Sequence, residues 1–72
     1  MRNDTAVFEA LRFDPVSGEK VPTGRMGTRE AIRRDGLLVD RSSLGYCPHE
    51  WIDSNGYVDA ELASRFRYQL AL

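Results

Sequence analysis

Alternation of apolar and polar residues near the start of the chain predicts a β-strand. Between residues 6 and 13, three of the four odd positions are apolar (Val7, Leu11 and Phe13), as in a strand with one apolar face. Phe8 and Leu11 would also suit one face of a helix. The turn residues that follow favour the strand.

Residues 14–19 predict a turn, because Pro15 presets φ and Gly18 accepts a positive φ without steric cost. Residues 20–21 would return as a short strand that Pro22 stops. Residues 23–27, with two glycines, have the composition of a loop. The chain is therefore expected to open with a β-hairpin and a connecting loop.

Residues 28–35 predict a short helix with recognisable ends. Thr28 can cap the first turn, and Gly36 can take the left-handed conformation that stops a helix. Arg29 and Arg33 are four residues apart and therefore share one face. A helix this short needs tertiary contacts to persist.

The segment 44–58 holds the single Trp, Cys and His of the chain and is expected to be a structural centre. The apolar run 37–40 predicts a strand before it. Within it, residues 50–58 predict strands joined through Asn55-Gly56, a strong hairpin signal. Alternatively, residues 49–53 form a single helical turn after a proline.

The end of the chain predicts an amphipathic helix over residues 59–71. Val58, Leu62, Phe66 and Leu70 recur every four residues and form one apolar stripe. Asp59 is a suitable N-cap. We expect this helix to cover one face of the sheet.

Together these elements predict an α+β fold with a small antiparallel sheet. The sheet would comprise the N-terminal hairpin and strands near 37–40 and 50–58, packed by the helices 28–35 and 59–71. Residues 1–5 are expected to form a flexible N-terminus, and residues 6–72 a single small globular domain.

Composition excludes several classes of protein. The 72 residues are 42% apolar and carry a net charge of −1, an ordinary globular composition. One Cys and one His cannot provide a disulfide or a four-ligand zinc site, so no metal or cofactor is expected. The N-terminus lacks the apolar core of a signal peptide, and no apolar run approaches the ~20 residues of a membrane span. The cytoplasm is the expected location.

Charge is unevenly distributed along the chain. Residues 20–41 carry six basic and three acidic side chains, whereas residues 42–64 carry four acids and no Lys or Arg. Arginine and aromatic residues dominate the energetics of protein interfaces. The candidate partner-binding residues are Arg25, Arg29, Arg33, Arg34, Arg41, Tyr46 and Trp51.

These observations predict a small non-catalytic binding or regulatory protein, of adaptor or inhibitor type. It would dock through its arginines on a larger partner, most simply a protein with an acidic surface, and no small-molecule substrate or membrane is indicated. The equally simple interpretation of the arginines is a solvated helix face with local ion pairs to Glu30 and Asp35.

Two other functions have weaker support in the sequence. A DNA-binding regulator would use the basic helix 28–35, but residues 41–44 make a poor start for the recognition helix of a helix-turn-helix, because Gly45 and Pro48 follow closely. A thiol enzyme would use Cys47 and His49, but no third group to orient the imidazole is evident. Both are therefore secondary to protein binding.

Overall fold

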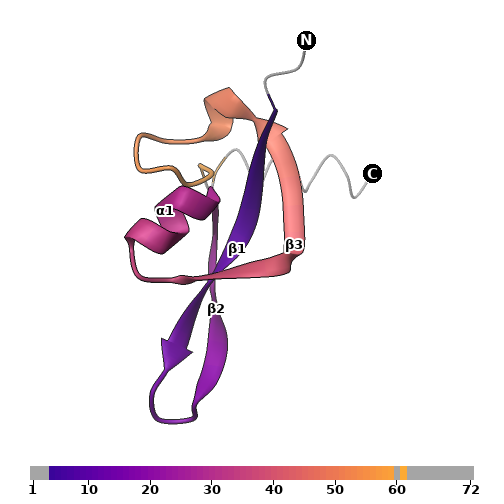
Figure 1. The fold of residues 1–72 in the computed structure, drawn as a ribbon. Helices are drawn as coiled ribbons and strands as arrows, with labels where there is room; N and C mark the ends of the chain where they lie inside the picture. Colours follow the sequence, from indigo (N-terminus) through magenta and orange to yellow (C-terminus); the bar gives the residue numbers. More distant parts are fainter. Residues whose placement is uncertain (1–3, 60, 62–72) are drawn as a thin grey trace.

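The structure is a computed structural model that describes residues 4–59 and 61. In this part of the chain, a three-stranded antiparallel sheet is joined by one α-helix and one 3₁₀ helix (Figure 1). The elements are β1 (Asp4–Asp14), β2 (Glu19–Gly27), α1 (Arg29–Arg34), β3 (Leu38–Pro48) and η1 (His49–Trp51). The strand order is β2-β1-β3, so the long first strand is central. The arrangement is of the predicted α+β type.

The predicted N-terminal hairpin is confirmed. Its turn is held by Asp14, whose carboxylate accepts hydrogen bonds from the Val16 backbone N–H at 3.0 Å and the Ser17 hydroxyl at 3.1 Å. Gly18 has a φ of 72°, as the turn requires. The expected end of the second strand at Pro22 was wrong, because β2 continues through the predicted loop 23–27.

Strand β2 continues past Pro22 because the Thr23 side chain bonds to β1 at the point where the β2 backbone bulges. Leu11 is opposite Pro22 and Glu9 is opposite Met26, so β2 has two extra residues here. The Thr23 hydroxyl donates a hydrogen bond to the Ala10 carbonyl at 2.7 Å. A buried carbonyl next to the bulge therefore keeps a partner.

Strand β3 bulges in the same way on the other side of β1. Val7 is opposite Gly45 and Glu9 is opposite Asp40, which leaves residues 41–44 outside the regular ladder. The Ser43 hydroxyl accepts the Glu9 backbone N–H at 2.7 Å. Figure 1 shows β3 turning a corner along its length.

The predicted helix 28–35 is confirmed as α1. The Thr28 hydroxyl accepts the Ala31 backbone N–H at 3.2 Å, which caps the first turn. At the other end, the Gly36 N–H donates to the Arg33 carbonyl and the Leu37 N–H donates to the Ile32 carbonyl. These two bonds, with a φ of 73° at Gly36, form a Schellman stop.

The second half of the chain departs further from prediction. The strand expected at 37–40 runs on to Pro48, so residues 41–44 are strand and not helix. The strand expected from residue 50 was wrong, because residues 49–51 form the helical turn that was the alternative. Residues 52–58 form a loop closed by two isolated bridges, Gly27 with Tyr57 and Ile52 with Val58.

The core lies between β1 and α1. Buried residues from β1, α1 and the 52–58 loop form one cluster: Phe8, Ala10, Ala31, Ile32 and Tyr57. Ala6, Phe8 and Ala10, at alternate positions of β1, thus share the face that packs against this cluster. Val7 and Cys47 are also buried, and the pairing of Thr5 with Cys47 places them on the opposite face of the sheet.

Two predictions concern the ends of the chain. β1 begins at Asp4, so two residues of the expected flexible N-terminus, Asp4 and Thr5, pair with Pro48 and Cys47. The predicted helix 59–71 lies outside the described residues, apart from its first positions. Of the helices that the structure describes, none has the length and apolar character needed to cross a membrane.

Candidate functional site

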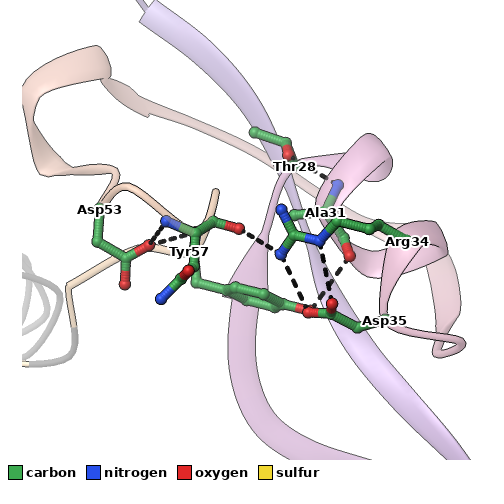
Figure 2. A network of polar contacts seen from close by, with 7 residues as sticks. Thr28, Ala31, Arg34, Asp35, Asp53 and Tyr57 are labelled. Atoms are coloured by element: carbon green, nitrogen blue, oxygen red, sulfur yellow. Dashed lines mark hydrogen bonds and ion pairs between the residues drawn. The ribbon is translucent and has the colours of Figure 1, made fainter.

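Tyr57 is the centre of a polar network that joins the loop to α1 (Figure 2). Its side chain is 1% exposed, and its hydroxyl donates a hydrogen bond to the Asp35 carboxylate at 2.7 Å. The Ala31 carbonyl lies 3.5 Å from the same hydroxyl. Asp35 in turn forms an ion pair with Arg34, with 3.1 Å between Nε and Oδ1.

Residues of the 52–58 loop hold Tyr57 in place by hydrogen bonds to the Tyr57 backbone. The Asp53 carboxylate accepts the Tyr57 N–H at 3.1 Å, and the Asp53 N–H donates to the Tyr57 carbonyl at 2.8 Å. Gly56 packs on α1 so closely that a Cβ there would lie 2.6 Å from the Ala31 Cβ. The Thr28 N–H donates to the Gly56 carbonyl at 2.9 Å. The Asn-Gly sequence therefore fastens the loop to the start of the helix.

The pKa shifts of Asp35 and Tyr57 agree with a hydrogen bond from the Tyr57 hydroxyl to the Asp35 carboxylate. The hydrogen bond from Arg34, followed by that from Tyr57, lowers the pKa of the Asp35 carboxyl. Burial, followed by the hydrogen bond to Asp35, raises the pKa of the Tyr57 hydroxyl. Tyr57 thus remains a neutral donor to an ionised carboxylate, the stronger type of hydrogen bond.

Two of the seven candidate binding residues belong to this network. The Arg25 guanidinium lies 4.0 Å from the centre of the Tyr57 ring, a cation–π contact. Arg34 donates to the Asn55 carbonyl at 2.8 Å besides pairing with Asp35. The predicted local ion pair to Asp35 is thus present, and Arg34 has a structural role.

Arg29 and Arg33 lie on the other flank of α1. Consecutive helical residues are about 100° apart, so these two diverge from Arg34, and both are exposed. The Arg29 guanidinium lies 5.5 Å from the centre of the Phe8 ring. Within residues 4–59 and 61, neither side chain forms an ion pair. We call Arg29 and Arg33 the basic flank.

The remaining candidates come from the third strand and the turn after it. Arg41 is exposed in the β3 bulge. Tyr46 is 65% exposed on β3, opposite Ala6, while Trp51 is half-buried in η1. The seven candidates therefore divide among the Tyr57 network, the basic flank, β3 and η1.

Cys47 and His49, the residues that a thiol enzyme would use, lie in different environments: Cys47 is buried and His49 is exposed. Burial raises the pKa of the Cys47 thiol, with a further contribution from Asp4, so the nucleophilic thiolate is disfavoured. His49 is exposed, and its Nδ1 lies 3.1 Å from the Thr5 hydroxyl. No group of three or more His, Cys, Asp or Glu side chains that could hold a metal occurs in the described part of the chain.

The sequence interpretation missed the role of Tyr57 as the buried link between loop and helix. The available signal was the position of Tyr57 directly after Asn55-Gly56, which marks the return of a tight turn. Comparison of the chain with protein-family models, with curated proteins and with solved structures found no match.

Proposed function

We propose that this chain is a small non-catalytic binding protein that docks through the basic flank of α1 on an acidic surface of a protein partner. The protein would act as an adaptor or as an inhibitor. Arg41 contributes only if the partner reaches β3, and Arg25 and Arg34 primarily support the fold.

The observation that supports this proposal is the contrast between the arginines of one short helix. Arg34 is engaged by Asp35 and by the Asn55 carbonyl. Arg29 and Arg33 are exposed and have no ion pair among the described residues, although they sit on a helix anchored at both ends. Guanidinium groups on a rigid element suit bidentate recognition of carboxylates.

DNA binding remains the secondary proposal. Against it, α1 has six residues and its inner face is packed on the sheet, so little helix is left to enter a major groove. The net charge of −1 gives no general attraction to phosphate.

The test is affinity capture from the native source with the Arg29→Glu/Arg33→Glu variant as bait beside the unchanged protein. A matched control is Arg12→Glu/Lys20→Glu, two exposed basic residues on the hairpin. Each double variant changes the formal charge by −4, from −1 to −5. Only the basic-flank variant should lose the partner.

Equal recovery with all three baits would exclude the basic flank as the docking surface. Titration with a labelled DNA duplex distinguishes DNA binding from protein binding. A DNA binder would lose affinity steeply between about 50 and 200 mM salt, and a protein-directed module would not bind the duplex at all.

We further propose that residues 59–71 form the amphipathic helix that their spacing predicts. One described bond supports it: the Asp59 carboxylate accepts the Glu61 backbone N–H at 2.9 Å, as an N-cap does. If the stripe packs on the sheet, Phe66→Ala should lower the free energy of unfolding by about 3–5 kcal/mol. Tyr68→Ala is the matched control, because Tyr68 lies two positions after Phe66, about 200° around a helix, and is therefore off the stripe. Equal unfolding midpoints for the two variants would exclude the packed helix.

A further inference from the structure

We infer that the outer edge of β3, over residues 45–47, is a second docking surface, which accepts an extended basic segment of a partner protein as an added strand. This surface is separate from the basic flank and selects the opposite charge. Four features of β3 lead to it.

The first feature is position. In the described part of the chain the sheet order is β2-β1-β3, so β3 pairs with β1 on one side only. Such an edge presents backbone donors and acceptors that an extended peptide can pair with.

The second feature is the direction of those groups. Pro48 is opposite Asp4 but has no N–H, so this pair cannot exchange two hydrogen bonds. In an antiparallel ladder the hydrogen-bonded pairs alternate. Cys47 with Thr5 and Gly45 with Val7 are therefore the bonded pairs, and the backbone N–H and C=O of Tyr46 face outward.

The third feature is the exposed apolar surface at the same place. Tyr46 is 65% exposed and Leu44 is 49% exposed. Tyr46 lies in the regular ladder and Leu44 lies at the adjoining end of the bulge, so both exposed side chains are close to the open backbone groups. A large exposed aromatic residue next to an edge that no described strand pairs with is unusual, because native edges are commonly protected.

The fourth feature is charge, which indicates the partner. Residues 42–59 contain no Lys or Arg, and the exposed acids Asp4 and Glu50 lie at the Pro48 end of the edge. The other outer edge, that of β2, carries Lys20, Pro22 and a bulge, which protect it. Among residues 4–59 and 61, no strand pairs with the outer edge of β3 between its bulge and Pro48, and the acids near its Pro48 end favour a basic strand.

The test uses a labelled peptide of about ten residues that alternates arginine and valine, titrated by fluorescence anisotropy into the full chain. We expect saturable binding, and we expect Tyr46→Ala to weaken it about tenfold or more. Phe13→Ala is the matched control, since Phe13 is 58% exposed but lies seven residues along β1 from the partner of Tyr46, about 23 Å away.

A charge pair of variants completes the design. Glu50→Lys should weaken binding about threefold, whereas Glu19→Lys, an exposed acid at the hairpin, should leave it unchanged. Amide exchange by NMR should slow at Tyr46 when peptide is present.

Four outcomes would overturn the inference: no saturable binding, equal binding by the Tyr46→Ala and Phe13→Ala variants, equal binding of a peptide that alternates glutamate and valine, or a dimer of the free chain that Tyr46→Ala abolishes. The last outcome would assign the edge to a second copy of the chain. None of them depends on the basic flank.

Discussion

Replacing Gly27 by alanine tests the packing of Tyr57 most directly. A Cβ at Gly27 would lie 2.6 Å from Cδ1 of the Tyr57 ring and 3.0 Å from the Gly56 carbonyl oxygen. Carbon atoms in contact are normally about 3.5–4.0 Å apart, so the ring would have to move by about 1 Å.

The ring has little freedom to move. Its hydroxyl is bonded to Asp35, one side is covered by the Arg25 guanidinium, and its backbone is bonded to Asp53. Overpacking of this kind costs about 1–3 kcal/mol, and the constraints favour the upper end. Replacing a strand glycine by alanine returns about 0.5–1 kcal/mol of conformational entropy. The net loss in the free energy of unfolding should be about 2 kcal/mol.

Thermal unfolding followed by circular dichroism measures this loss. For a domain of this size, about 2 kcal/mol corresponds to a fall in Tm of roughly 8–16 °C. Gly45→Ala is the matched control, because the nearest atom to its added Cβ is the Ser43 carbonyl oxygen at 4.0 Å and its φ is not positive. That variant should be as stable as the unchanged chain, or more so by up to about 1 kcal/mol. If both variants unfold at the same temperature, Tyr57 does not pack on Gly27.

Three further predictions follow from the polar contacts. The pKa of Asp35 is lowered in the folded state, so the stabilising effect of this carboxylate is complete above its unfolded pKa of about 3.9 and is lost as the pH falls through the folded pKa. Asp35→Asn should therefore flatten the fall of Tm below about pH 4. If Tm falls in the same way in the variant and in the unchanged chain, the network around Asp35 is contradicted. Ser43→Ala removes the acceptor of the part-buried Glu9 N–H and should cost about 1–2 kcal/mol in urea unfolding. Ser42 is exposed and its hydroxyl donates to the Asp40 carboxylate, so Ser42→Ala should cost less than about 0.5 kcal/mol. Burial raises the pKa of the Cys47 thiol, so alkylation at neutral pH should be slower than in the urea-unfolded chain, and equal rates would place the thiol at the surface.

The sequence alone determined the elements whose chemistry is local. The hairpin turn follows from Pro15 and Gly18, and α1 follows from its Thr28 cap and Gly36 stop; the structure contains each. These features are predictable because the groups that satisfy one another lie within a few residues along the chain.

The lengths of the strands depend on contacts between segments that are far apart in the sequence. Prediction ended the return strand at Pro22 and the third strand at residue 40, because proline and a Ser-rich stretch usually interrupt a ladder. Both strands continue because Thr23 and Ser43 supply hydrogen bonds to β1 from 13 and 34 residues away in sequence. No local pattern reveals which hydroxyl will face which backbone group.

The same distinction applies to the candidate site. Composition located an arginine-rich stretch, and helical spacing placed Arg29 and Arg33 on one face. That Arg25 covers the Tyr57 ring and that Arg34 is held by Asn55 depends on the docking of the 52–58 loop against α1, a contact between segments more than twenty residues apart. A guanidinium has the same charge wherever it lies, so only its neighbours in the folded chain separate an arginine that supports the fold from one that is exposed to a partner.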